Sequence, residues 1–320
     1  MSTRISTCAP VLLALIGASI AGCAQSRTAV VSTSAKVNPV PPISGLAEMD
    51  HGTYLTVHDA KAFEPDATRI GRISIDEEGG TVEFVRLEFP AAASGPSSDL
   101  ESICRIPGRA GEFLLSESGY WQGDFGRVFH VRVSGTEVSL IHEFQLPKFR
   151  ENNPAQLDGD QLEGLACFAR MDGLVTVFLG ERGGTDIYPT GIIRWGAYDA
   201  DNGAIEWSIQ EYIVEAPNPW GEPALRSITG LSIDNQDRLW ASAAVDAGDF
   251  GPFRSVVYEV GTVNDGNVMP LIFGKARESH IVNGFKIEGV AAGDSSSILG
   301  IGIEGEAFGG TLRRLTLNSD

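Results

Sequence analysis

Several kinds of chemistry have no support in this amino-acid sequence. The chain has only five histidines, and none of them is spaced as a pair of zinc ligands. A Gly-x-Ser-x-Gly nucleophile elbow, a glycine-rich phosphate-binding loop and a His-Glu-x-x-His motif are all missing. The sequence therefore gives no reason to expect a serine hydrolase or a zinc enzyme of these types.

Positive charge is also scarce. The chain carries 24 Lys and Arg against 42 Asp and Glu, for a formal net charge of −18. Nucleic-acid binding depends on clustered Lys and Arg that neutralise phosphates, so a nucleic-acid partner is excluded, and cations are the expected counterparts. No segment has a sustained helical period, whereas 38 glycines indicate many turns. These features predict an all-β protein.

The N-terminal segment predicts export and a lipid anchor. Arg4 is the only charge before an apolar run at residues 11–20, which is too short for a permanent membrane span. The following IAGC at residues 20–23 resembles a bacterial lipobox. We expect residues 1–22 to be a signal peptide and Cys23 to be lipidated, with residues 23–41 as the anchored tether before a domain at 42–320. The alternative is an ordinary signal peptide with a chance cysteine.

The resemblance to a lipobox also implies a location. Ala24 follows the cysteine, and by analogy this favours sorting to the outer membrane, facing the periplasm, with the membrane as a partner through the lipid on Cys23. Only Cys104 and Cys167 then remain in an oxidising compartment. Their offset along equivalent strands could make them face each other, so a disulfide is possible, but two buried free thiols are favoured.

Five segments share one pattern: a polar residue, a small residue and an aliphatic residue that open a short strand. Their starts are spaced roughly 57 to 66 residues apart, which indicates a repeat architecture, and they lie at Ser44, Glu101, Glu163, Thr229 and Glu288. Each repeat reads as up to four short strands. The fifth repeat lacks a last strand, which residues 28–32 could supply. We predict a five-bladed β-propeller of four-stranded blades closed by this N-terminal strand, with six blades as the alternative.

The strand pattern gives approximate positions for the blades. In the second repeat Phe129, Val131 and Val133 alternate with polar residues, as expected of a half-buried strand. In the fourth repeat we expect residues 268–273 to form the outermost strand. We expect residues 274–284 to form a loop to the next blade, alongside long loops at 147–160 and 215–227.

The propeller topology brings acids together at one end of the central channel. Glu101, Glu163 and Glu288 are expected in an inner ring that Ser44 and Thr229 complete. A second ring lies nearby, formed by Asp59, Glu117, Glu181, Asp246 and Glu304. Crowded carboxylates repel one another, and Ca²⁺ takes six to eight oxygen ligands, so Ca²⁺ bound by the inner ring is one interpretation. Pairing of these acids with backbone amides of neighbouring blades is the other.

The loops at the same mouth carry basic side chains. Lys148, Arg150, Arg182 and His280 are candidate ligands for a phosphate group on a small phosphorylated molecule.

Three stretches resemble the phytase-like propeller family, also described as esterase-like activity of phytase. They are LESICR with LLSESGYWQGDFGRVFHV, LEGLACFARMDGLVTVFLGERGG, and KIEGVAAG with GGTLRRL, and the resemblance covers about residues 42–317. Glu101, Glu163 and Glu288 also look like positions of the calcium-activated nucleotidases, which are five-bladed propellers with Ca²⁺ in the channel. Thr229 departs from that pattern.

Two functions from different classes follow from these observations. One is a Ca²⁺-dependent phosphoester hydrolase of the cell envelope, in which Glu181 or Glu304 positions the attacking water. The other is a non-catalytic lipoprotein that binds a ligand or a protein partner with the propeller face.

Overall fold

The structure is a computed structural model, and the parts of the chain it describes consist of strands and their connections. The described residues are 40–76, 81–121, 124–146, 161–185, 189–248, 250–264, 271–272, 276–277, 279–293, 297–305 and 307–317. Across these ranges no helix is long and apolar enough to cross a membrane. The signal peptide, Cys23 and the closing strand expected at 28–32 lie outside the described residues and stay predictions.

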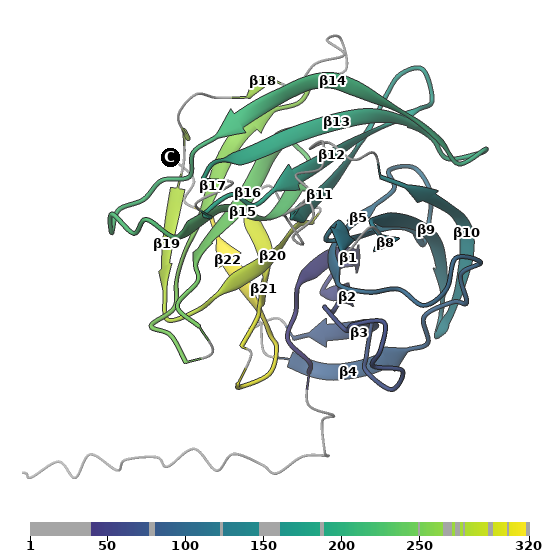
Figure 1. The fold of residues 1–320 in the computed structure, drawn as a ribbon, viewed down its shortest axis with the longest axis horizontal. Helices are drawn as coiled ribbons and strands as arrows, with labels where there is room; N and C mark the ends of the chain where they lie inside the picture. The colour runs from purple at the N-terminus through teal and green to yellow at the C-terminus, as the bar shows by residue number, and fades with distance from the viewer. Residues whose placement is uncertain are drawn as a thin grey trace, which may run out of the picture. The chain divides into compact units, whose positions relative to one another are not determined.

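The strands form five consecutive antiparallel blades (Figure 1). Blade one contains β1 (Gly45–Asp50), β2 (Thr53–Val57), β3 (Ile70–Ile75) and β4 (Thr81–Leu87). Blade two contains β5 (Leu100–Arg105), β6 (Glu112–Glu117), β9 (Arg127–Ser134) and β10 (Glu137–Gln145), with a separate hairpin of β7 (Tyr120–Trp121) and β8 (Asp124–Phe125). Blade three contains β11 (Leu162–Ala169), β12 (Val175–Glu181), β13 (Gly191–Asp199) and β14 (Ala204–Val214).

The last two blades depart from a simple four-strand order. Blade four contains β15 (Leu225–Ile233), β16 (Arg238–Val245) and β17 (Arg254–Thr262). Its outer position is divided between β18 (Leu271–Ile272) and β19 (Ser279–Asn283), which pair with opposite ends of β17. Blade five contains β20 (Ile287–Ala292), β21 (Ile298–Ile303) and β22 (Thr311–Thr316) among the described residues.

The first strands of the blades pack around one axis. Each of β1, β5, β11, β15 and β20 contacts the next one, and β20 contacts β1 again, so the ring is closed. The five-bladed prediction is confirmed, and the six-bladed alternative is wrong. The loop predicted at 274–284 is also wrong in part, because β19 lies within it; its residues alternate between exposed and partly buried, as a strand edge requires.

Among the described residues, the core consists of five hydrophobic clusters, each shared by two neighbouring blades. For example, Ile103, Phe129 and Leu55 lie in a cluster between blades one and two, whereas Ala291 and Leu46 lie in one between blades five and one. Because each sheet buries both faces against its neighbours, the strands carry long runs of apolar residues instead of a strict alternation. This packing fixes the position of every first strand.

The first strands approach each other so closely that side chains are limited. A Cβ atom on Gly45 would lie 2.8 Å from the Glu101 carbonyl oxygen, and one on Gly230 would lie 2.8 Å from that of Glu288. One residue further along, an aliphatic side chain from each blade lines the channel: Leu46, Ile103, Leu165, Leu231 and Val290. We call these five residues the aliphatic ring. It separates two mouths of the channel.

A disulfide joins two of the blades. Cys104 in β5 and Cys167 in β11 have Cα atoms 5.7 Å apart and are bonded, at the mouth opposite the acids. The expectation of two free thiols is therefore wrong. The one-residue offset between the two cysteines places them on facing sides of adjacent first strands, which allows the bond.

Loss of this disulfide should destabilise the protein. The Cys104→Ser/Cys167→Ser double variant is expected to lose about 4 kcal/mol of unfolding free energy, because the cysteines are 63 positions apart and the unfolded chain regains the freedom of that loop. Guanidinium denaturation followed by tryptophan fluorescence measures the loss. Added dithiothreitol should lower the stability of the wild type to that of the variant. Equal midpoints without reductant would contradict the prediction.

Candidate functional site

The inner-ring acids each occupy a β-bulge at one end of a first strand. The pairing of β5 with β6 shifts register between Leu100 and Ser102, so Glu101 is the inserted residue. The same shift isolates Glu163 in β11 and Glu288 in β20. A bulge redirects a side chain away from the regular alternation of a strand. The bulges are therefore what presents these acids to the channel, and we call this end the acid mouth.

Lys and Arg side chains neutralise two of these three acids. Arg182 Nη1 donates to Glu163 Oε1 at 2.7 Å, and Lys286 Nζ lies 3.0 Å from Glu288 Oε1. Arg226 Nη1 donates to the same Glu288 oxygen at 3.4 Å and also pairs with Asp246. Lys286 pairs with Glu304 as well. The backbone-amide pairing that we considered from the sequence is not what balances these charges. Buried ion pairs do so.

Glu101 differs from the other two ring acids. Its carboxylate has no hydrogen bond or ion pair with any described residue, although Lys61 lies close enough to feel its charge. Burial raises the pKa of Glu101 well above its usual value, and the nearby charges of Asp99, Glu163 and Glu288 raise it further. Burial likewise raises the pKa of Glu288, with Glu304 adding to the shift and Lys286 opposing it. The mouth therefore combines acids of raised pKa with several cations.

Further polar atoms at the acid mouth are buried without a partner among the described residues. They are Ser44 Oγ, Ser102 Oγ, Gln161 Oε1 and Arg182 Nε. The cavity between the inner-ring acids Glu101, Glu163 and Glu288 and the aliphatic ring is only about 10 Å³. This is close to the smallest space that holds one water molecule. Buried donors and acceptors are rarely left unsatisfied, so these atoms mark a place for water or for a small polar ligand group.

The described residues do not fit the Ca²⁺ site that the sequence suggests. They contain no group of three or more His, Cys, Asp or Glu side chains arranged to hold a metal ion. Oxygens of Glu163 and Glu288 face Arg182 and Lys286, where a cation would compete with these charges. We therefore derive no chemical step through Ca²⁺, and Ca²⁺ binding stays a prediction.

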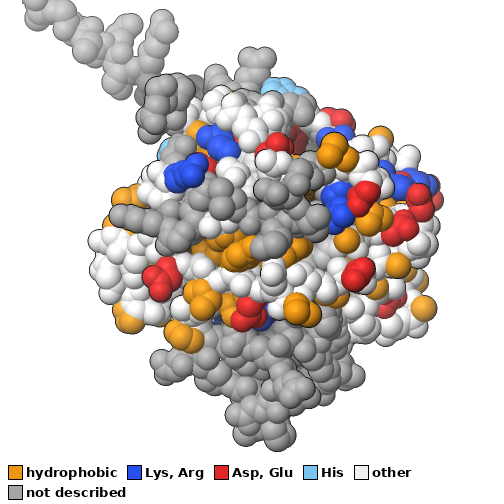
Figure 2. All heavy atoms as spheres, turned by 90° about the horizontal axis from the view of Figure 1, so that it is seen from above, with side chains coloured by type: hydrophobic (Ala, Val, Ile, Leu, Met, Phe, Trp, Pro, Cys, Tyr) orange, Lys and Arg blue, Asp and Glu red, His pale blue; other side chains and the backbone are white. Residues whose placement is uncertain are grey.

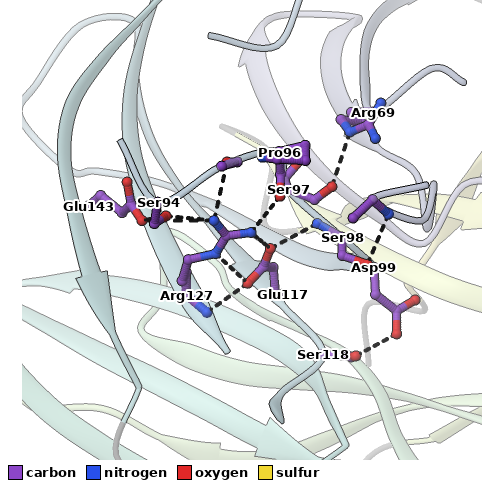
Figure 3. Close-up of polar contacts among 12 residues, drawn as sticks. Arg69, Ser94, Pro96, Ser97, Ser98, Asp99, Glu117, Ser118, Arg127 and Glu143 are labelled. Atoms are coloured by element: carbon purple, nitrogen blue, oxygen red, sulfur yellow. Dashed lines mark hydrogen bonds and ion pairs between the residues drawn. The ribbon is translucent and has the colours of Figure 1, made fainter. Parts of the chain in front are cut away.

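The second-ring acids lie at the ends of the second strands, as the propeller topology predicts. Glu117 and Glu181 are fully buried and pair with arginines of the third strands. Arg127 Nε and Nη2 both donate to Glu117 (Figure 3), whereas Arg194 bridges Glu181 at 2.9 Å and Glu211 at 3.0 Å. These pairs hold strands of one blade together.

The Glu117–Arg127 pair also fixes the loop that leads to Glu101. Arg127 Nη2 donates to the Pro96 carbonyl oxygen at 2.7 Å, and Glu117 Oε1 accepts from the Ser98 amide at 2.8 Å (Figure 3). Asp99 follows in a left-handed conformation with φ of 61°. Its carboxylate accepts from Ser118 at 2.6 Å and pairs with Lys61. Consecutive hydrogen bonds therefore connect the Glu117–Arg127 pair of blade two with Asp99, which lies two residues before Glu101.

The remaining candidates are spread over the molecule. Arg182 lies at the acid mouth as expected, whereas Lys148 and Arg150 lie outside the described residues. His280 belongs to β19, opposite Val257, and its ring is 6.2 Å from that of Trp240. This places His280 on the outer strand of blade four and not in a loop of the mouth.

On the face shown in Figure 2, the charge of the described residues does not point to the site. On the described part of the face shown in Figure 2, acidic side chains lie beside Lys and Arg and among hydrophobic side chains. The charges that mark the candidate site are those of the acids and cations at the acid mouth.

Sequence reasoning missed four cations of these networks: Lys61, Arg127, Arg194 and Lys286. Lys286 stands two residues before Glu288, on the other side of a bulge that has no sequence signature. Arg127 and Arg194 lie early in third strands, which pair with the strand ends that carry Glu117 and Glu181. Aligning the second and third strands of each blade in register would have identified Arg127 and Arg194 as the partners of Glu117 and Glu181.

Comparison with known proteins supports the fold and goes no further. No protein-family model matches the sequence, and no curated protein matches it. Among solved structures, an exo-1,5-α-L-arabinanase from a bovine ruminal metagenomic library is 10% identical, with a TM-score of 0.51 over 89% of this chain and 96% of that one. An α-L-arabinanase of Cellvibrio cellulosa, solved with arabinohexaose, is 13% identical, with a TM-score of 0.50 over 88% and 93%. Similarity at this identity shows a shared architecture alone.

Breaking one partner of the buried Glu117–Arg127 pair should be costly. Arg127→Met leaves the Glu117 carboxylate buried without its partner and is expected to lower the unfolding free energy by about 3–5 kcal/mol. The Glu117→Gln/Arg127→Met double variant should recover part of that loss. Denaturation curves measure both. Arg105→Met, at an exposed position, serves as the control and should change stability by less than about 0.5 kcal/mol. A loss in Arg127→Met no larger than the control would contradict this role.

Proposed function

We propose that this protein is a hydrolase whose reaction takes place at the acid mouth, with Glu101 as the general acid. The observation that carries the proposal is the contrast among the ring acids: Glu163 and Glu288 are ion-paired, whereas Glu101 has no partner among the described residues. A general acid must hold its proton near the working pH, and burial together with the neighbouring carboxylates raises the pKa of Glu101 in that direction.

The cations around Glu101 favour a phosphate ester as the substrate. Arg182, Arg226 and Lys286 all reach the acid ring, and Arg182 keeps a buried Nε donor without a partner among the described residues. Arginine donates in a fork that matches phosphate oxygens, and a compact ammonium adds a point charge. A phosphate group at the mouth could accept from these donors, whereas the cavity of about 10 Å³ beyond the acids fits only a water molecule. This substrate class agrees with the resemblance to the phytase-like family.

The chemistry requires one proton transfer in each direction. Water attacks phosphorus, the bond from phosphorus to the ester oxygen breaks, and Glu101 gives its proton to the leaving alcohol oxygen. The phosphate product keeps the oxygen of the water, and a proton from that water restores Glu101. The cations bind the phosphoryl oxygens and stabilise charge on them. Glu181 and Glu304, which the sequence suggests as water-positioning acids, pair with Arg194 and Lys286, and their catalytic role stays a prediction.

A second candidate is a non-catalytic binding protein. It is favoured by the ion pairs of Glu163, Glu288 and the second-ring acids, which serve architecture whether or not any reaction takes place. Many propellers only bind ligands or protein partners.

The hydrolase proposal predicts turnover that depends on Glu101. The purified protein should hydrolyse at least one member of a panel of nucleotides, phytate and chromogenic phosphate esters, and Glu101→Gln should lower kcat by about 10²–10⁴-fold. Because the protonated form is reactive, kcat/KM should fall as pH rises through the pKa of Glu101, and this alkaline limb should be absent in Glu101→Gln. Glu206→Gln, on an exposed position of β14, is the matched control and should keep full activity.

The same assay separates the alternatives. Parallel reactions with Ca²⁺ and with a chelator test the metal dependence, which the Glu101 proposal does not require. Absence of turnover throughout the panel would overturn the hydrolase and leave the binding protein. Turnover that survives in Glu101→Gln would reject the assigned acid and direct attention to Glu181 and Glu304.

We also propose that the chain is exported and anchored by lipid on Cys23, on the periplasmic side of the outer membrane. The Cys104–Cys167 disulfide supports export, because disulfides persist in oxidising compartments and are rare in the cytosol. This reasoning is independent of the lipobox-like sequence.

Substitution of Cys23 tests the anchor. In a cell that expresses the full chain, wild type should fractionate with membranes and incorporate labelled palmitate, and Cys23→Ser should do neither, since the thiol is the lipid acceptor. Cys8→Ser, within the expected signal peptide, controls for loss of a cysteine. Membrane association that is unchanged in Cys23→Ser would contradict lipid anchoring through this residue.

A further inference from the structure

A pocket of about 420 Å³ lies on blade one, outside the channel. It is formed by the loop between β2 and β3 and by the loop between β4 and β5. Its walls are mostly apolar, with Ala62, Pro65, Phe89 and Ala92 among them. Its polar members are Arg69, Arg86, Ser97 and the acidic Glu88. Pockets that bind small molecules commonly occupy 300–1,000 Å³ and combine apolar walls with a few polar groups. Its size and lining are therefore those of a ligand site.

The register of the blades explains why Arg69 is unusual. In blade two, Ser116 pairs with Val128, so the next pair outward is Glu117 with Arg127. In blade one, Val57 pairs with Ile70, and the next pair is His58 with Arg69. Arg69 is thus the counterpart of Arg127, but His58 stands where blade two has a carboxylate.

His58 does not supply the missing charge. Its ring contacts the Pro42 carbonyl oxygen at 2.6 Å and the Thr56 hydroxyl at 3.0 Å, and burial lowers its pKa to about 4. His58 is therefore neutral at ordinary pH. Blade one contains a buried guanidinium without the anion that blade two provides.

Arg69 is satisfied only by backbone carbonyls. It is 8% exposed, and it donates to the carbonyl oxygens of Ser97, Glu64, Ala67 and Lys61 at 3.0–3.3 Å (Figure 3 shows the contact with Ser97). Among the described residues no carboxylate forms an ion pair with Arg69. A buried charge without a counter-ion is unfavourable. The pocket it lines therefore favours an anion.

Two neighbours strengthen this preference. Ser97 lines the pocket, and its Oγ atom is buried and has no hydrogen-bond partner among the described residues. Arg86 adds a second positive charge to the wall. Arg86 Nη1 donates to the Asp66 carbonyl oxygen at 2.7 Å. The Glu88 carboxylate is 3.8 Å from Arg86 Nε and 89% exposed, so that ion pair is weak. An unsatisfied hydroxyl and two guanidinium groups therefore line one apolar pocket.

We propose that this pocket binds a small organic acid, with its anionic head on Arg69, Arg86 and Ser97 Oγ and its apolar body against Ala62, Phe89 and Ala92. The site goes beyond the proposed hydrolase and does not depend on it. The two are nevertheless joined by the loop at residues 95–99, whose first half lines the pocket and whose Asp99 pairs with Lys61 near Glu101.

Binding of 4-phenylbutyrate to the purified full chain tests the proposal. Calorimetry should detect one site, and the neutral analogue 4-phenylbutanol should bind at least about tenfold more weakly, since it lacks the charge. Ser97→Ala should weaken binding of the acid by about tenfold, and Arg86→Gln should weaken it severalfold and reduce its salt dependence. Both substitutions spare the backbone contacts of Arg69.

A filling substitution locates the site. Ala91→Trp, at an exposed position of the pocket rim, should abolish binding, and Ala204→Trp, exposed on β14, should leave it unchanged. Thermal unfolding of each variant shows whether it is folded. The proposal is overturned if the acid does not bind, if the alcohol binds equally well, or if folded Ala91→Trp binds the acid like wild type.

Discussion

The closeness of the five first strands is the constraint on which the rest of the structure depends. Their backbones meet around one axis with room for little more than glycine, as the contact that a Cβ of Gly45 would make with the Glu101 carbonyl shows. A side chain larger than that of glycine fits only where it points into the channel. The aliphatic ring fills the middle, and the bulges at Glu101, Glu163 and Glu288 turn acids toward one end.

Crowded acids then dictate the electrostatics around them. Carboxylates taken out of water must be protonated, paired or hydrogen-bonded. Glu163, Glu288 and the second-ring acids are paired, and some of these pairs join segments that are distant in sequence, as Arg226 does with Glu288. Glu101 is partly exposed and has no such pair among the described residues, and its raised pKa is a consequence of partial burial and of the same crowding. Structure and proposed chemistry thus arise from one arrangement of charges.

Much of the fold could be predicted from the sequence, because repeat spacing and alternation are local signals. The blade number, the first strands and the shared mouth of Glu101, Glu163 and Glu288 are examples. The site was predicted less well. Glu288, the inserted residue of a bulge, pairs with Lys286 two residues before it, and the bulge has no sequence signature. Cys104 meets Cys167 because two strands of different blades pack together. The division of the outer strand of blade four was missed because β18 and β19 are short.

The aliphatic ring also has a consequence for traffic through the molecule. Because five side chains, from Leu46 to Val290, occupy the channel between its mouths, the propeller is two back-to-back cups and not a tube. A ligand that enters at the acid mouth would therefore leave through the same mouth. Under the proposed hydrolase function, substrate and product would share the acid mouth as their route. The rate of product release would then depend on how weakly the cations at that mouth bind an anion. The mouth at Cys104 and Cys167 would be a separate chemical environment, open to different ligands.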